Sequence, residues 1–133
     1  MSEQLRAAPL LAIVVPCYNE EEVFPYCLRE LKGLLGTMAG DGLIKADSFV
    51  LFVNDGSRDT TWKLIGDAVA ANRCVRGLQL SRNEGHQSAL MAGLAAVDET
   101  VEVIVSIDAD LQADVNATRR MVEAYRAGAV AVY

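Results

Sequence analysis

The chain has 133 residues, of which 52% are hydrophobic and 23% charged, so its composition is that of a folded globular protein and excludes a disordered one. Its net charge is −6 and its 12 basic residues form no run or stripe, which argues against a nucleic-acid-binding surface. Its three cysteines have no paired spacing, so they indicate reduced packing residues and exclude a disulfide or zinc framework.

Apolar runs typical of strands alternate along the chain with segments in which apolar residues recur at helical spacing. In chain order these are a strand Leu10–Val15, a helix Glu20–Leu35, a loop Gly36–Asp47, a strand Ser48–Val53, a helix Thr60–Asn72, a strand Val75–Leu80, a helix His86–Val97, a strand Val101–Ile107, a helix Val115–Ala127 and a fifth strand beginning at Ala129–Tyr133. Asp59 is placed to cap the second helix. The apolar face predicted for that helix consists of Trp62, Ile65, Ala68 and Val69.

Repeated strand–helix units with nearly continuous apolar strands predict an α/β fold, in which a mostly parallel sheet carries helices on both faces. The length fits one domain, residues 1–133. Crossovers between parallel strands are right-handed, so the carboxyl ends of all strands meet at one edge, where ligands of such sheets bind. Four polar segments follow the first four strands, namely Pro16–Glu20, Asn54–Asp59, Ser81–His86 and Asp108–Gln112.

The fourth of these segments contains two aspartates directly after an apolar run. In extended backbone the side chains of Asp108 and Asp110 point the same way, and two close carboxylates repel each other unless a cation or a shared proton lies between them. Mg²⁺ and Mn²⁺ prefer oxygen ligands and commonly take one or two carboxylates together with substrate phosphates. The pair therefore indicates a metal-bound phosphate ester or nucleotide. The alternative is a polar loop with two solvated aspartates, and the convergence of four polar strand ends favours the metal site.

The other strand ends each have a functional and a structural interpretation. Asp55 either bonds its own turn or accepts N–H groups of a nucleobase, and Gly85 either makes a plain turn or lets backbone N–H groups at a helix start approach a phosphate. Tyr18 either fills the core or stacks on a base. His86, the only histidine, either occupies the helix start or donates to a phosphate. Of the acidic residues that start the first helix, only Glu20 is near enough to the strand end to be a ligand candidate.

Four stretches together resemble the family 2 glycosyltransferases of the GT-A fold, a Rossmann-like α/β fold, over essentially the whole chain. They are VVPCYNEEE, FVNDGSRDTTW, LSRNEGHQSALMAGL and SIDADLQ. In order, they are similar to the family's first-strand nucleotide motif, its Asp-Gly-Ser-x-Asp-x-Thr base-binding loop, its Arg-Asn-x-Gly loop with the following helix, and its Asp-x-Asp metal motif. The Asp-Ala-Asp-Leu-Gln form resembles most the polyprenyl-phosphate branch, which includes dolichol-phosphate mannose synthases and bactoprenol glucosyltransferases.

The resemblance implies transfer of a sugar from a UDP- or GDP-sugar to a polyprenyl phosphate, with Mg²⁺ or Mn²⁺ as a cofactor that stabilises the departing nucleoside diphosphate. It implies a nucleotide-binding set with Arg82 nearby: Pro16, Tyr18, Glu20, Asp55, Asn83, Gly85 and Asp108. It implies three metal ligands: Asp108, Asp110 and Gln112. Two positions depart from the family pattern. Asn54 stands where many relatives have a first aspartate, and Ala113-Asp114-Val115 stands where the family often has Asp-Pro-Pro.

The resemblance also places the acceptor site and the catalytic base beyond Tyr133, so we expect the chain to hold the nucleotide-binding half, truncated in the fifth strand. No stretch approaches the roughly 20 apolar residues of a spanning helix, so we expect a cytoplasmic protein whose longer relatives lie at the cytoplasmic face of the membrane. The alternative function is a non-catalytic nucleotide-sugar-binding or assembly module, with homo-oligomers formed through an exposed strand edge. A phosphate-accepting receiver domain is rejected, because no acidic pair follows the first strand and no aspartate follows the third.

Overall fold

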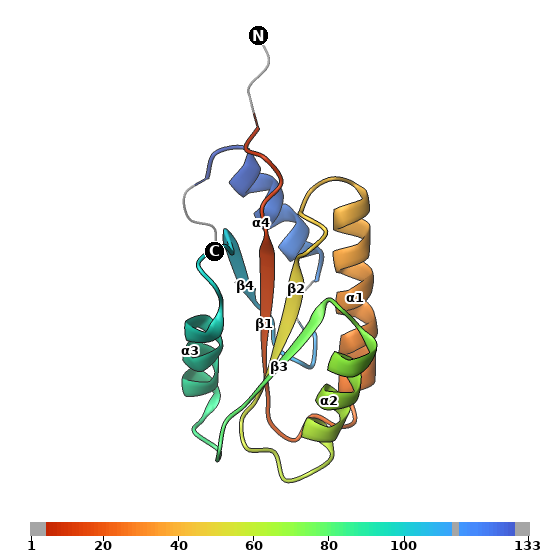
Figure 1. The fold of residues 1–133 in the computed structure, drawn as a ribbon, viewed down its shortest axis with the longest axis vertical. Helices are drawn as coiled ribbons and strands as arrows, with labels where there is room; N and C mark the ends of the chain where they lie inside the picture. Colours follow the sequence, from red (N-terminus) through yellow and green to blue (C-terminus); the bar gives the residue numbers. More distant parts are fainter. Residues whose placement is uncertain (1–4, 113–114, 130–133) are drawn as a thin grey trace.

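The computed structural model describes residues 5–112 and 115–129. Within them four strands alternate with four helices (Figure 1), in the order β1 (Leu11–Cys17), α1 (Phe24–Gly40), β2 (Phe49–Asn54), α2 (Thr61–Ala71), β3 (Val75–Gln79), α3 (His86–Ala96), β4 (Val103–Ser106) and α4 (Asn116–Arg126). The alternation confirms the predicted α/β class. Of the predicted fifth strand, all residues but Ala129 lie outside the described residues. No helix in the described ranges is long and apolar enough to cross a bilayer.

The strands form one parallel sheet in the order β3-β2-β1-β4. The chain adds β2 and β3 on one side of β1 and then β4 on the other, so the direction of strand addition reverses between β1 and β4. Ligands of open α/β sheets bind outside the carboxyl ends of the strands at such a reversal. Because all four strands are parallel, the segments that follow them meet at one edge, toward the lower side of Figure 1.

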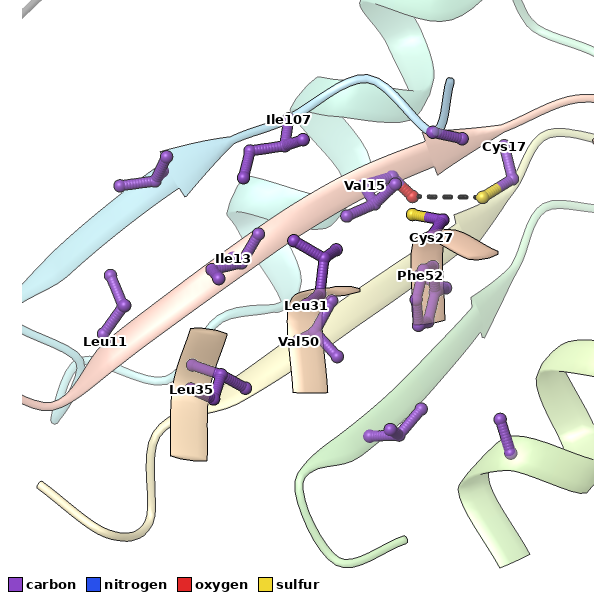
Figure 2. Close-up of a cluster of buried hydrophobic side chains, with 14 of the residues drawn as sticks. Leu11, Ile13, Val15, Cys17, Cys27, Leu31, Leu35, Val50, Phe52 and Ile107 are labelled. Atoms are coloured by element: carbon purple, nitrogen blue, oxygen red, sulfur yellow. Dashed lines mark hydrogen bonds between the residues drawn. The ribbon is translucent and has the colours of Figure 1, made fainter. Parts of the chain in front are cut away.

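Both faces of the sheet are covered by helices, as predicted, and β1 supplies the centre of both layers. Its odd-numbered residues from Leu11 to Cys17 join a core formed with α1, α2 and α4, as Figure 2 shows for the α1 side. Its even-numbered Ala12 and Val14 join a second core, to which α3 contributes Ala89. The alternation follows from the two-residue period of a strand. Because β1 is buried on both sides, its carboxyl end is a rigid base for the polar segment that follows.

Helix α1 differs from its prediction at both ends. It begins at Phe24, whose backbone N–H donates to the Glu20 carbonyl, and not at Glu20 itself. The predicted loop is wrong over Gly36–Gly40, where the helix continues. Leu35 and Met38 are buried on the face of α1 that packs against the sheet. This packing outweighs the poor helix propensity of the glycines, because most helical stability in proteins comes from burial of an apolar face.

Helix α2 confirms part of its predicted apolar face. Ile65 and Ala68 are buried and Trp62 is partly buried, but Val69 is 40% exposed, so its assignment to that face is wrong. Val69 follows Ala68 by one position, which turns it about 100° around the helix and away from the narrow stripe that contacts the sheet. The structure places the N-cap of α2 at Thr60, which makes no side-chain cap bond. Asp59, one residue earlier, accepts the backbone N–H of Thr61, the first helical residue, at 2.9 Å and so pairs one of the free amides of the first turn.

Candidate functional site

A pocket of about 180 Å³ opens where the first three strands end. Its lining comes from the carboxyl end of β1, from the segments after β1, β2 and β3, and from the first residue of α3: Pro16, Cys17, Tyr18, Glu20, Asp55, Asn83, Gly85 and His86. Six of the seven residues predicted to bind a nucleotide line this pocket. Cys17, for which the sequence indicates only a packing role, lines it as well. Tyr18 is 41% exposed, so a face of its ring is open to a flat ligand at this edge.

A second hollow adjoins the first on the side of β4. It is lined by Pro16, Glu20, His86, Asp108, Ala109 and Asp110, and it shares the first three with the pocket. The structure therefore brings Asp108, the seventh predicted nucleotide residue, beside the other six. Gln112, the third predicted metal ligand, lines neither hollow. Its side chain is exposed, and its backbone N–H donates to Asp110 Oδ1 at 3.2 Å.

The segment after β4 makes a tight turn and does not continue as a strand. Leu111 N donates to the Asp108 carbonyl at 3.0 Å, and Leu111 has a φ of 52°, a conformation that is rare for a bulky residue other than glycine. Ala109 is buried between the two aspartates, whereas Asp108 and Asp110 are exposed and line the same hollow. The turn thus holds two carboxylates at the strand end, with the backbone strain that often accompanies a functional site.

The segment after β1 is held in place by the segment after β2. Asn19 adopts a φ of 51°, which asparagine tolerates, and its backbone N–H donates to Ser57 Oγ at 2.9 Å. Its side-chain carbonyl accepts the Arg58 N–H at 2.8 Å. The next backbone N–H, that of Glu20, donates to Thr61 Oγ1 at 2.9 Å. These three bonds hold the backbone on both sides of Asn19 beside the pocket. They join segments far apart in the chain, so the sequence indicates them only through its turn-forming residue types.

Asp55 is almost fully buried, with 3% of its surface exposed. Its two carboxylate oxygens accept the backbone N–H groups of Glu84, at 2.7 Å, and of Gly85, at 3.0 Å. Both donors belong to the segment after β3, so Asp55 links two of the loops that line the pocket. The structural interpretation of Asp55 as a residue that bonds its own turn is wrong, because these partners lie in a different loop.

Negative charge gathers around the second hollow. Burial raises the pKa of Glu20 above its ordinary value, and the nearby carboxylates of Asp110, Asp59 and Asp108 raise it further. His86 Nε2 lies 3.6 Å from Asp108 Oδ1, and the two form an ion pair when the imidazole is protonated. Clustered carboxylates of this kind favour the binding of a cation, which relieves their mutual repulsion.

The donor chemistry of the hollow suits a hard divalent cation, because Mg²⁺ and Mn²⁺ prefer carboxylate oxygens. No three acidic, histidine or cysteine side chains of residues 5–112 and 115–129 lie close enough together to hold a metal ion between them. This arrangement fits an ion that takes one or two protein carboxylates and fills its remaining positions with phosphate oxygens and water. Three carboxylates line the hollow, those of Glu20, Asp108 and Asp110, and metal ligation by Asp108 and Asp110 stays a prediction.

The buried thiols are unsuited to nucleophilic chemistry. Burial raises the pKa of Cys27 to about 12, with smaller contributions from Glu20 and Asp110. Burial likewise raises the pKa of Cys17, and Cys27 and Glu20 add to the effect. Because the thiolate is the reactive form, Cys17 contributes shape and not reactivity to the pocket.

A further acidic hollow beside the site is lined by Asn19, Glu20, Glu21, Glu22, Val23 and Asp59. Another hollow lies between β4 and α4, and it is lined by Glu102, Val103, Ile104, Val105, Met121, Tyr125 and Ala129. It contains none of the residues in the four segments that follow the strands. Convergent polar side chains are what distinguish a ligand site from a packing gap, so the two hollows at the strand ends are the candidate site.

Comparison with known proteins agrees with the geometry. Residues 12–133 match the family described as Glycosyl transferase family 2. The glycosyltransferase YkoT of Bacillus subtilis is 44% identical over 128 residues, which are 96% of this chain and 38% of YkoT. The bactoprenol glucosyl transferase of Shigella phage SfX is 32% identical over 120 residues, which are 90% of this chain and 36% of that protein. The chain thus spans 36–38% of the length of these curated relatives.

The fold also matches a solved structure. The mannosyltransferase PcManGT from Pyrobaculum calidifontis, in complex with GDP-Man and Mn²⁺, superposes with a TM-score of 0.68 and 17% sequence identity, over 98% of this chain and 37% of that one. At this identity the likeness concerns the fold alone, and it confirms the Rossmann-like GT-A architecture.

Proposed function

The chain belongs to glycosyl transferase family 2, and on that premise we propose that its strand-end pocket binds the nucleotide part of a nucleotide-sugar donor. The observation that carries the proposal is the convergence of three loops on one pocket directly beside the Asp108–Asp110 turn. A nucleoside in the pocket has its phosphates at the adjoining acidic hollow. An anionic ligand meets repulsion there, so the geometry favours a donor that arrives with a divalent cation.

Each wall of the pocket offers a different contact to the nucleoside. The exposed Tyr18 ring is available for stacking on a base. Asp55 keeps lone pairs on both oxygens beyond its two backbone bonds, so it can accept an N–H of uracil or guanine. Asn83 and Gly85 border the nucleotide from the β3–α3 side, with Arg82 nearby, and Pro16 and Glu20 border it from the β1 side.

We assign the cation, Mg²⁺ or Mn²⁺, to Asp108 and Asp110, with the Gln112 side chain as a third oxygen donor and Asp108 also within reach of the ribose. A divalent ion at this position supplies Lewis-acid stabilisation of the negative charge that develops on the departing nucleoside diphosphate. The carboxylates orient the diphosphate beside the pocket. His86, which lines both hollows, adds a donor on the phosphate side.

For the whole protein we propose transfer of the sugar to a polyprenyl phosphate at the cytoplasmic face of a membrane. The support is the name of the phage relative, a bactoprenol glucosyl transferase. The acceptor site and the catalytic base are assigned beyond Tyr133, where the family resemblance places them. The donor is a UDP-sugar or a GDP-sugar, and the experiment below tests one of each.

A titration of UDP-glucose and GDP-mannose tests the proposal by calorimetry, with Mn²⁺ and with EDTA. We expect one of the two nucleotide-sugars to bind in the presence of Mn²⁺ and to lose about tenfold or more in affinity with EDTA or in Asp110→Asn, because a charge-assisted contact is lost. The matched control is Asp47→Asn, which removes an exposed carboxylate that precedes β2, at the opposite end of that strand from Asp55, and we expect it to leave the affinity unchanged. Absence of metal-dependent binding for both nucleotide-sugars contradicts the proposal.

A second candidate is a nucleotide-sugar-binding assembly module that pairs through a strand edge. The observation that favours it is β4, an edge strand of the described sheet whose Ile104 side chain is 41% exposed. Light scattering at increasing concentration tests it, with Ile104→Lys as the disrupting variant. A concentration-dependent dimer that Ile104→Lys abolishes supports the module, and a monomer throughout contradicts it.

A further inference from the structure

Asp55 contacts a loop that is distant in the sequence, and binding a nucleotide does not require this contact. Its side chain is buried, and its two oxygens each accept one backbone N–H, from Glu84 and from Gly85. Hydrogen bonds to a charged acceptor are about twice as strong as those between neutral groups, and two of them on adjacent amides fix both position and orientation. The carboxylate therefore binds a loop of its own chain before any ligand arrives.

The neighbouring residue packs against the same loop. Gly56 has a φ of +68°, and a Cβ at this position would lie 2.3 Å from the Asn83 backbone nitrogen and 2.5 Å from the Arg82 carbonyl carbon. The obstacle is backbone and not a flexible side chain, so the loop must shift to admit even a methyl group. Two consecutive residues after β2 thus define where the Arg82–Gly85 loop runs.

That loop forms one wall of the pocket. Asn83 and Gly85 line the pocket, and Gly85 precedes α3, whose first residue His86 lines it too. The opposite wall carries Tyr18 and is tied by Ser57 Oγ, which accepts the Asn19 N–H at 2.9 Å. The segment after β2 therefore binds both walls of the pocket, one through Asp55 and the other through Ser57.

We propose that Asp55 is a positioning residue, whose carboxylate holds the Arg82–Gly85 loop in the shape that forms the pocket wall. The effect of Asp55 on nucleotide affinity rests on the proposed function, whereas its effect on the position of the Arg82–Gly85 loop does not. A residue acting only by direct contact with a base would leave the loop unchanged when replaced. A positioning residue alters the loop in the ligand-free protein.

Backbone amide hydrogen exchange, followed by NMR on the ligand-free chain, separates these roles. In the wild type we expect slow exchange at Glu84 and Gly85, although the Glu84 residue is exposed. In Asp55→Asn an NH₂ group replaces one acceptor, and we expect exchange at one or both amides to accelerate about tenfold or more. Gly56→Ala displaces the same loop by an independent route and is expected to accelerate the same amides.

The matched control is Ser57→Ala, which removes the bond to Asn19 on the opposite wall. We expect it to accelerate exchange at Asn19 and to leave Glu84 and Gly85 protected. Asp55→Glu retains the carboxylate and is expected to restore part of the protection that Asp55→Asn loses. Nucleotide affinity is measured in parallel, and we expect it to fall in Asp55→Asn and in Gly56→Ala alike.

Each outcome decides between the roles. Fast exchange at Glu84 and Gly85 in the wild type overturns the proposal, and this measurement holds even if Asp55→Asn fails to fold. Loss of nucleotide affinity in Asp55→Asn with both amides still protected also overturns it, because Asp55 then acts by direct contact. Accelerated exchange in the two variants, in a protein whose wild type binds no nucleotide, supports the positioning role and refutes the proposed function alone.

Discussion

The contact between α3 and the sheet depends on a residue without a side chain, Gly93. A Cβ at this position would lie 2.6 Å from Val14 Cγ1 and 2.9 Å from Val53 Cγ2. Val14 and Val53 are fully buried β-branched residues of the two central strands, so their methyl groups have little room to move. Gly93→Ala therefore overpacks the layer that holds α3, and with it the start of the helix at the pocket.

The magnitude follows from two opposing terms. Replacing glycine by alanine in a helix interior stabilises it by about 1 kcal/mol, whereas overpacking a core costs about 1–3 kcal/mol. The matched control is Gly66→Ala in α2, where a Cβ meets nothing within 4 Å and only the first term acts. We expect Gly66→Ala to raise the free energy of unfolding by about 1 kcal/mol, and Gly93→Ala to lie about 1–3 kcal/mol below it.

Urea unfolding followed by far-UV circular dichroism measures both variants. With two-state behaviour and equal m values, the shift in midpoint reports the change in free energy directly. The two helices have the same length, and both glycines lie in their interiors, so helix propensity cancels between the variants. Equal stabilisation of the two variants would refute the close packing of α3 on β1 and β2.

Three further results are expected. Asp59→Ala lowers the free energy of unfolding by about 1 kcal/mol at pH 7, because the charged carboxylate loses its hydrogen bonds. Burial works against the charged form of Asp59, but the hydrogen bonds to the carboxylate outweigh burial and hold the Asp59 pKa below its ordinary value. Measured against pH, the difference in stability between wild type and variant should therefore shrink as the pH falls below about 4, through the folded-state pKa. With a disulfide-exchange reagent, Cys74 reacts fast in the native protein and Cys17 and Cys27 react only on unfolding, so fast reaction of either buried thiol is the contrary result. Arg6→Ala lowers the stability by about 1–3 kcal/mol in thermal melts, since its guanidinium donates to three backbone carbonyls at the end of α4, and a silent substitution would contradict that role.

The sequence was sufficient to predict the edge of the sheet at which the site lies. Parallel strands bring their carboxyl ends together whatever the details of the helices, so Tyr18, Asp55 and Asn83 could be placed together from strand order alone. The structure confirms that they line one pocket, with Asp108 beside it. That pattern survives errors of several residues in the helix boundaries.

The features that the sequence did not predict depend on contacts between distant segments. The extension of α1 to Gly40 depends on burial of Met38, and no local preference of glycine indicates it. The exposure of Val69 depends on how narrow a stripe of α2 the sheet covers. The two amides bound by Asp55 lie in another loop, so only tertiary structure reveals them.

A divalent cation and a nucleotide are proposed to meet at the Asp108–Asp110 turn, and paramagnetic broadening by Mn²⁺ reports on that position in the chain. NMR spectra of the ligand-free chain are compared before and after substoichiometric Mn²⁺ is added with the nucleotide-sugar that binds. We expect broadening to centre on the amides of Asp108–Gln112 and to reach Gly85. Broadening centred instead on the other acidic hollow, which Glu21, Glu22 and Asp59 line, would contradict it.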